Sequence, residues 1–585
     1  MKGAELKIGP VLSFRGLGED GRWKVTALIG VEGAAAAPRL VLDEVSCGEP
    51  VELAAVGGLK MLRYDFSVRL SGSERRVSYA IEGMDLKWSF TVPAEGDAPR
   101  AAYVSCNGFS DPNRVRKLKL DINAVWRDLL CNHDRQMRPT KPGAYTLDRE
   151  QLWHEEAIHD HGVQRFHLLL MGGDQIYFDS IWEELPVLKR WVQLSREQQL
   201  GFKVSKALDR QIERYYFGLY PKRWLDEKRG AWSSASCSLD AATAMASIPT
   251  IMMWDDHDII DGWGSYSAEM QRCPLFKVIF KHARRAFWVF QMQQRLEHLP
   301  ELEPHPARGA AAPGAPQFKG VLWSEVLKGD TMALPLLDGQ PGFSSAFRMG
   351  SMALLVADLR TERSGTQILG LDSWAVIGKW SRTLAADGDA VSHLMVMSSV
   401  PVIHPKMTLA EEALEVFGSD HVQDSSADDL KDHWSHDDHE AERKQLLEML
   451  MSAAKRGNFA GYLLSGDVHV AAWGLATRTD IASDERWARV YQFTSSAIVH
   501  PSLVGVHERL FLWWLNRAAG KPQQIDTALR AEMVLFPGHN RHLMAARNWL
   551  ALEVWGAAAG PKPAKLWATW RCEGEVGFSS HTQAV

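Results

Sequence analysis

The sequence predicts a mixed α/β protein that carries a small β-sandwich at its N-terminal end. Two observations support this prediction. Up to about residue 98, short alternating or β-branched segments are separated by Gly, Glu and Asp clusters, a pattern typical of antiparallel strands. From about residue 100, short apolar runs alternate with segments of helical period, which is typical of buried strands in an α/β sheet.

The chain is expected to divide into three parts. Residues 1–98 form an N-terminal β-sandwich domain, with strands expected at Trp23–Ile29, Arg39–Leu42, Leu62–Val68 and Val77–Ile81. The Gly, Asp and Pro of residues 95–99 favour a linker. Residues 99–503 form the α/β domain, and residues 504–585 form a helix-and-strand extension that packs on it as a lid or sheet edge.

Six apolar runs of the α/β domain are too short for helices and predict buried strands. They are Ala101–Val104, Phe166–Met171, Pro249–Met253, Met352–Val356, His393–Met397 and Gly461–Leu464. Helices are expected at Gln151–His159, Ser195–Phe217, Pro274–Leu299 and Glu440–Ala454, and a loop at residues 304–316.

Composition narrows the class of protein. Among 585 residues, 46% are hydrophobic and 24% are charged, which is ordinary for a globular protein with a sizeable core. A net charge of −6 argues against nucleic-acid binding as the main activity of the chain. Six scattered cysteines without a CxxC pair predict no disulfide framework. The sequence shows no membrane span and no signal peptide, so we expect a cytoplasmic protein, or a secreted one if a leader was removed.

Four of the predicted strands end in polar blocks. The blocks are SCN (Ser105–Asn107), GDQIY (Gly173–Tyr177), WDDHD (Trp254–Asp258) and SGDVH (Ser465–His469). Open α/β sheets place ligands beyond the carboxyl ends of their strands, so we expect these blocks to meet. Asp, His, Cys and Tyr without a glycine-rich phosphate loop indicate a metal site.

The ligand types suggest two unlike metal positions. Thiolate, phenolate and imidazole suit iron or zinc, whereas carboxylates alone suit calcium, magnesium or manganese. One position would lie near Cys106, Tyr177 and His469, and the other near Asp256 and Asp467. Asp174 has two carboxylate oxygens and could bridge them. Paired metal ions are a standard device for displacement at phosphorus.

The ordered blocks resemble those of the PhoD-like alkaline phosphatases and phosphodiesterases, a branch of the calcineurin-like metallophosphoesterases. In that branch the blocks are Ser-Cys, GDxxY, DDH[DE] and SGDVH, and the resemblance covers about residues 100–500. Asp358–Thr361, Ser398–Pro401 and Asp432–Trp434 are secondary matches. The resemblance implies a calcineurin-like metallophosphoesterase sandwich, in which helices flank two mixed β-sheets, behind an N-terminal β-sandwich.

The resemblance also implies roles for individual residues. The metal ligands would be Cys106, Asp174, Tyr177 and His469 for the first ion and Asp256 and Asp467 for the second, with Asp174 shared. His257 would face the phosphoryl group as the catalytic residue. Asn107 and Arg360 are further candidates for contact with substrate, Arg360 because a guanidinium suits bidentate contacts with phosphate. The ions would be Fe3+ and Ca2+, with Zn2+, Mn2+ and Mg2+ as alternatives. Asp258 stands where glutamate is usual, and residues 261–264 stand where an asparagine-containing segment is frequent. These departures leave the number and identity of the ions open.

Each candidate also has a plainer interpretation. Cys106 and Tyr177 could be packing residues, His257 an ion-paired structural histidine, and Asp256 and Asp467 helix caps or turn residues. Arg360 could form a structural salt bridge instead of binding phosphate. His404 could be a further ligand or a surface histidine. The acidic residues 419–440 favour a solvated loop over a metal-binding tract.

The predicted activity is hydrolysis of phosphate monoesters or diesters by a metal-activated hydroxide at a dinuclear-type site. The substrate would be a small-molecule or polymeric phosphate ester. Two alternatives are a nuclease-like metallohydrolase of the same fold and a catalytically inactive scaffold that keeps the fold and binds a partner. A nuclease should show a basic, aromatic-lined groove, and the sequence shows none.

Overall fold

The computed structural model describes residues 5–32, 37–42, 45–82, 87–110, 112–133, 165–224, 241–302, 320–386, 391–406, 434–481, 485–502, 506–555 and 564–585. The predicted helix at residues 151–159 and the predicted loop at 304–316 lie outside the described residues. So does most of the acidic segment 419–440.

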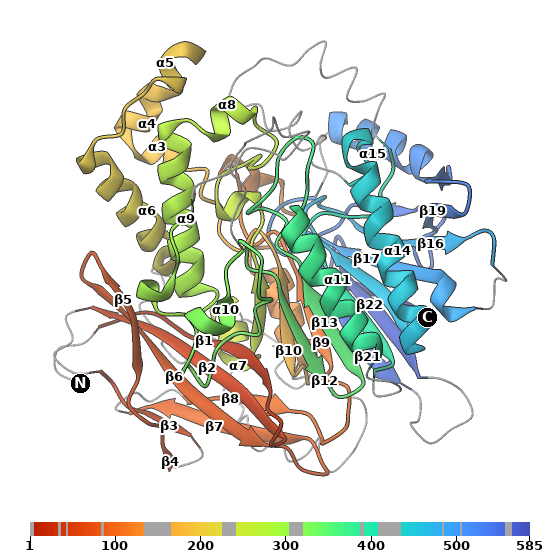
Figure 1. Ribbon diagram of the computed structural model, residues 1–585, viewed down its shortest axis with the longest axis horizontal. Coiled ribbons are helices and arrows are strands. Elements are labelled where there is room, and N and C mark those ends of the chain that lie inside the picture. The colour runs from red at the N-terminus through yellow and green to blue at the C-terminus, as the bar shows by residue number, and fades with distance from the viewer. Residues whose placement is uncertain are drawn as a thin grey trace.

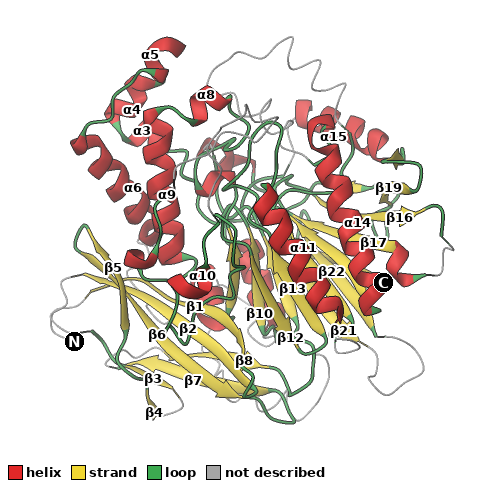
Figure 2. Cartoon of the chain, in the orientation of Figure 1, coloured by secondary structure: helices red, strands yellow, loops and turns green. Residues whose placement is uncertain are grey.

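Two large mixed sheets and one small antiparallel sheet form the framework (Figures 1 and 2). In spatial order the first sheet contains β23 (Phe578–Ala584), β22 (Lys565–Glu573), β21 (Asn548–Trp555), β9 (Ala101–Val104), β10 (Leu168–Gly172), β11 (Thr250–Met253), β1 (Glu5–Leu17), β2 (Arg22–Glu32), β6 (Leu59–Arg69) and β5 (Val51–Val56). The second contains β12 (Ser345–Met349), β13 (Met352–Val356), β14 (His393–Met397), β15 (Ala460–Ser465), β17 (Arg489–Ser495), β16 (Ala471–Arg478), β19 (Leu529–Val534) and β18 (Gln523–Gln524), with β20 (Leu543–Met544) also paired to β16. The small sheet contains β4 (Val45–Ser46), β3 (Leu40–Leu42), β7 (Arg75–Ile81) and β8 (Lys87–Val92).

The central strands of the two large sheets, such as β9, β10, β13 and β14, are buried on both faces. Their alternate side chains point into different cores. In β10, Leu168 and Leu170 belong to the core shared by the two sheets, whereas Leu169 and Met171 face the helices. The helices outside the first sheet include α1 (Ala124–His133), α3 (Ile181–Glu184), α4 (Pro186–Trp191), α6 (Lys206–Trp224) and α9 (Pro274–Phe290). Those outside the second are α11 (Leu371–Ala386), α14 (Glu440–Gly457) and α15 (Val506–Ala519). This arrangement confirms the predicted two mixed sheets flanked by helices.

The parallel strands place several loops at the same edge. β9, β10 and β11 are mutually parallel in the first sheet, and β13, β14, β15 and β17 are parallel in the second. All six predicted strands of the α/β domain are present within two residues of their expected bounds. The polar blocks that follow β9, β10 and β11 therefore gather at one edge of the first sheet.

The N-terminal strands are shared between two sheets. β1 pairs in parallel with β11 at Ser13 and Thr250, so β1, β2, β6 and β5 extend the first sheet (red to orange in Figure 1). The remaining N-terminal strands form the small sheet. The strands of the expected sandwich are thus present, while the first sheet continues across residue 98. The division into domains at residues 98 and 503 stays a prediction.

The C-terminal strands complete the other edge of the first sheet. β21 pairs antiparallel with β9, and β22 and β23 follow outward. The strand-like end of the chain thus lies at an edge of the first sheet. No helix among the described residues is long and apolar enough to cross a membrane.

Two predicted helices are shorter or divided in the structure. The segment predicted at Ser195–Phe217 is split into α5 (Arg196–Leu200) and α6, because Gly201 ends the first helix and the Ser205 hydroxyl accepts a hydrogen bond from the first turn of the second. The helix predicted to Leu299 ends at Phe290. Gln293 then has a φ of 49°, and the carbonyl of Met292 accepts a hydrogen bond from the buried Arg15.

Candidate metal centre

The four polar blocks meet at the strand ends of the two large sheets. The backbone N–H of Asn107 donates to the carbonyl of Asp174 at 2.8 Å, which ties the first block to the second. A Cβ atom added at Gly466 would lie 2.3 Å from the Ser105 hydroxyl, so only glycine allows the block after β15 to approach the block after β9. The close approach joins strand ends from different sheets into one site.

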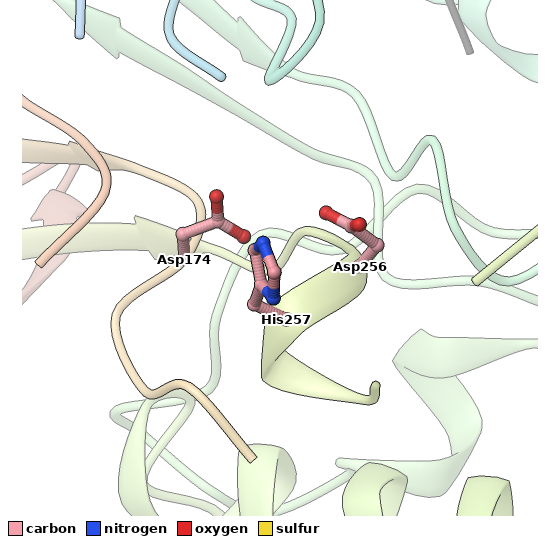
Figure 3. Close-up of side chains that lie close together, drawn as sticks. All are labelled: Asp174, Asp256 and His257. Carbon is pink, nitrogen blue, oxygen red and sulfur yellow. The ribbon is translucent and has the colours of Figure 1, made fainter. Parts of the chain in front are cut away.

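A group of four carboxylates, three of them buried and one half-buried, lies at the centre of this site. One oxygen from each of Asp174, Asp255, Asp256 and Asp467 lies within 4.8 Å of the others. Asp174 and Asp256 also form a group with His257, and Figure 3 shows their carboxylates on either side of the imidazole ring. Three of these carboxylates were predicted as metal ligands, and Asp255 was not. Four carboxylates this close repel one another strongly unless cations lie among them.

Cys106 and Tyr177 border the carboxylate group. The Cys106 sulfur lies 3.5 Å from Oδ2 of Asp174 and 3.2 Å from the Ser496 hydroxyl. The Tyr177 hydroxyl and Oδ1 of Asp174 are buried without a hydrogen-bond partner among the described residues. Buried polar atoms without partners are unusual, and a bound cation would satisfy both.

His469 lies beside Cys106 but farther from the carboxylates. Its backbone N–H donates to the Ser496 hydroxyl at 2.9 Å, and the same hydroxyl contacts the Cys106 sulfur. Within the described parts of the chain, no group with all donor atoms within 4.8 Å includes His469. The structure therefore places His469 at the same edge as Cys106, and its assignment as a ligand stays a prediction.

The backbone at this edge is held in an uncommon conformation. Seven non-glycine residues of the described chain have positive φ, and five of them line the site: Cys106 (53°), Asp174 (56°), Asp467 (67°), His469 (53°) and Ala497 (75°). Each left-handed non-glycine residue costs free energy, roughly 1 kcal/mol or more. Such residues tend to cluster at functional sites, where the surrounding structure fixes the direction of the side chain.

The electrostatic surroundings agree with a cation-binding site. Burial raises the pKa of Asp174 well above its usual range, and Asp256 and Asp255 raise it further, while His257 opposes them. Burial and the Asp174 charge also raise the pKa of the Cys106 thiol. A bound cation acts in the opposite direction on both groups, since it favours their charged forms.

His257 is oriented by a carboxylate that was not predicted. Nδ1 of His257 lies 2.8 Å from Oδ2 of Asp179, and its Nε2 lies 3.9 Å from Oδ1 of Asp261. Burial alone would lower the pKa of His257, but Asp179, Asp256 and Asp261 outweigh it and raise this pKa well above its usual value. The imidazole is thus held in a fixed orientation beside Asp174.

Arg360 is enclosed by protein groups. Its side chain is fully buried, and the guanidinium donates to the Asp255 carboxylate, to Asp256 at 3.4 Å and to the Trp263 carbonyl at 2.9 Å. Of the two interpretations left open by the sequence, this geometry favours the structural salt bridge. Arg360 fixes the two carboxylates that open the third block.

The carboxylate of Asp258 is occupied by hydrogen bonds from protein groups. Its carboxylate accepts hydrogen bonds from the backbone N–H groups of Asp255 (2.9 Å) and Ile176 (3.1 Å) and from the Gln291 side chain (3.0 Å). Burial raises its pKa to about 7. Asp258 therefore ties the GDQIY block to the WDDHD block.

The remaining sequence candidates have clear positions. Asn107 is half-buried, and its Oδ1 accepts a hydrogen bond from the Trp126 indole at 2.9 Å, which leaves the NH2 group as the end that can reach a substrate. His404 is buried at 1% exposure, so the surface interpretation is wrong, and it joins no metal-type group among the described residues. Trp434 packs in the core outside the second sheet.

The fold and the carboxylate group define an α/β protein with a buried site suited to metal ions. Over its central region the chain matches the PhoD related phosphatase family, at residues 139–305 and 412–512. The matched ranges contain Asp174, Tyr177, the WDDHD block and the SGDVH block. Cys106, Asn107 and Arg360 lie outside them.

A relative in Saccharomyces cerevisiae, the uncharacterized protein YGR266W, is 26% identical over 440 residues. The similarity covers 70% of this chain and 56% of the relative. The chain thus spans little more than half the length of that relative.

Three residues at the site were missed from the sequence: Asp179, Asp255 and His500. Asp255 stands inside a recognised block, and Asp179 follows Tyr177 by two positions, so both had a local signal. His500 lies in the segment AIVHP, which follows a strand without any metal-type spacing. Its position becomes evident only from contacts that are remote in sequence.

Proposed function

We propose that this chain hydrolyses phosphate esters at a centre of two or more metal ions between its two large sheets. The observation that supports the proposal best is the close group of the buried Asp174, Asp255 and Asp256 with the half-buried Asp467. The match of the central region to the PhoD related phosphatase family supports the same chemistry. The proposed architecture is the calcineurin-like metallophosphoesterase sandwich, and the proposed ions are Fe3+ on the Cys106 side and Ca2+ on the carboxylate side.

The residues of the site fit such ions. Cys106, Asp174 and Tyr177 offer sulfur, carboxylate and phenol donors on one side, and Asp256 and Asp467 offer carboxylates on the other. Asp174 belongs to two of the three metal-type groups of the described residues and also contacts Cys106, so it could serve both positions. Bound cations would supply Lewis-acid polarisation of the phosphoryl oxygens and lower the pKa of water.

The chain's own residues would orient the substrate and handle the proton. His257 is held through Nδ1 by Asp179, so its Nε2 edge is the part that can donate to a leaving oxygen or stabilise charge on the phosphoryl group. The NH2 group of Asn107 can contact a phosphoryl oxygen. Arg114 in the 3-10 helix η1 (Pro112–Lys117) is half-buried. Besides burial, its positive charge lowers the pKa of His469 and of His500. Arg114 is thus the proposed cation on the substrate side, in place of Arg360.

The direct test is metal removal and reloading of the full chain. A chelator should abolish hydrolysis of nitrophenyl phosphate and bis(nitrophenyl) phosphate, and Fe3+ with Ca2+ should restore it better than Zn2+, Mn2+ or Mg2+. The ratio of the two rates gives the preference between monoester and diester. Undiminished hydrolysis by protein shown to be free of metal would contradict the proposal.

Asp179 offers a test of how His257 is positioned. Asp179→Asn should lower turnover by roughly 10²–10⁴-fold without loss of metal, because the amide no longer favours the required tautomer and orientation of the imidazole. The double variant with His257→Ala should be no slower than His257→Ala alone, since the two residues act as one unit. Additive losses in the double variant would mean that Asp179 acts independently of His257.

A further inference from the structure

A second histidine lies against His469 at the edge of the site. The rings of His469 and His500 stack with centroids 3.7 Å apart and an angle of 18° between their planes. His500 is 1% exposed, and its backbone N–H donates to the carbonyl of Cys106 at 3.2 Å. The backbone thus fixes His500 to the loop that carries the proposed thiolate ligand.

The hydrogen bond of the ring fixes its tautomer. Nδ1 of His500 lies 3.0 Å from the carbonyl oxygen of Pro501, and a carbonyl only accepts hydrogen bonds. Nδ1 therefore carries the proton and Nε2 presents its lone pair. No described residue forms a hydrogen bond with Nε2. A histidine that binds a metal typically donates its other ring N–H to a carbonyl or carboxylate in this way.

The His500 ring lies on the Cys106 side of the centre, among donors that suit a transition metal. The Tyr177 ring lies 6.1 Å away and nearly parallel, at 16°. Ala497, three residues before His500, forms a small buried cluster with Cys106 and Tyr177. An imidazole beside a thiol and a phenol suits a first-row transition metal better than calcium or magnesium.

We propose that His500 binds, through Nε2, the metal ion on the Cys106 side of the centre, next to His469. The inference rests on the proposed function only in taking this edge as a metal site. With His500, the metal position on the Cys106 side has two imidazoles, those of His469 and His500. The carboxylate side has only the imidazole of His257. A transition ion would thereby be favoured on the Cys106 side.

The experiment uses Co2+ as a spectroscopic probe bound to the full chain after removal of metal. His500→Ala and His500→Gln should weaken Co2+ binding by about tenfold or more and alter the ligand-field spectrum, and X-ray absorption should show one imidazole fewer. His393→Ala is the matched control, since His393, at the start of β14, is equally buried but bonds Tyr462 in β15. That variant should bind Co2+ as the parent does.

The outcomes separate this inference from the proposed function. If both His500 variants keep the parental Co2+ affinity and spectrum, His500 is not a ligand, and reduced hydrolysis would then indicate contact with substrate. If the parent binds Co2+ with the His500 signature but hydrolyses no phosphate ester under any metal, the ligand assignment holds and the proposed function fails. The melting curve of each metal-free variant shows whether a loss of Co2+ binding is caused by unfolding. His500→Gln is the milder of the two changes to the buried side chain.

Discussion

Replacing Asp174 by asparagine should remove most of the activity and lower the bound metal content at the same time. Asp174 belongs to two groups of metal-type side chains, and its Oδ2 lies 3.5 Å from the Cys106 sulfur. Its Oδ1 is buried without a partner among the described residues. A carboxylate shared by two ions supplies charge and geometry to both, and an amide supplies neither in full. The expected loss in turnover is at least about 10²-fold.

The measurements for Asp174→Asn are metal content after dialysis and turnover of nitrophenyl phosphate. Asp338→Asn is a matched control, because Asp338 is an exposed carboxylate that bonds Ser324 and lies in none of the metal-type groups of the described chain. It should leave both values unchanged. Full metal occupancy with near-normal turnover in Asp174→Asn would rule out the bridging role.

The α/β part of the fold was predictable because its strands are buried on both faces. A fully buried strand must be apolar throughout, so runs such as Ala101–Val104 and Met352–Val356 identify themselves in the sequence. The pairing of β1 with β11 could not be predicted, because Ser13 and Thr250 are remote in sequence and local patterning does not specify a distant neighbour. The same reason explains why the strands of residues 1–98 were expected to form a sandwich of their own, whereas β1, β2, β6 and β5 extend the first large sheet.

The site was predictable to the extent that its residues stand in blocks at strand ends. Asp174, Asp256 and Asp467 come from three blocks, and the structure brings their carboxylates within 4.8 Å of one another. Arg360 shows where prediction of the site from the sequence ends. Its sequence position could not distinguish a substrate contact from a salt bridge, and only the burial of its guanidinium against Asp255 separates the two. His500 stands in no block and depends entirely on tertiary contacts.

The second large effect is expected at His257, and it separates chemistry from metal binding. His257→Ala should keep the metals and the fold while turnover falls by roughly 10²–10⁴-fold, the range for a positioned acid or charge stabiliser. The reason is the hydrogen bond from Nδ1 to Asp179, which holds the ring beside Asp174 and Asp256 (Figure 3). The control is His282→Ala, since His282 is a buried histidine paired with Asp209 at 3.2 Å, outside the site.

The leaving group of the substrate then distinguishes the two roles of His257. A general acid matters little when the leaving group is a nitrophenolate, which departs without a proton, and matters greatly for an alkoxide. His257→Ala should therefore lose less activity on nitrophenyl phosphate than on an alkyl phosphate if the histidine donates a proton. An equal loss on both substrates would favour stabilisation of charge on the phosphoryl group. Because His257 lies within 4.8 Å of Asp174 and Asp256, a loss of metal that matches the loss of activity would instead make His257 a ligand.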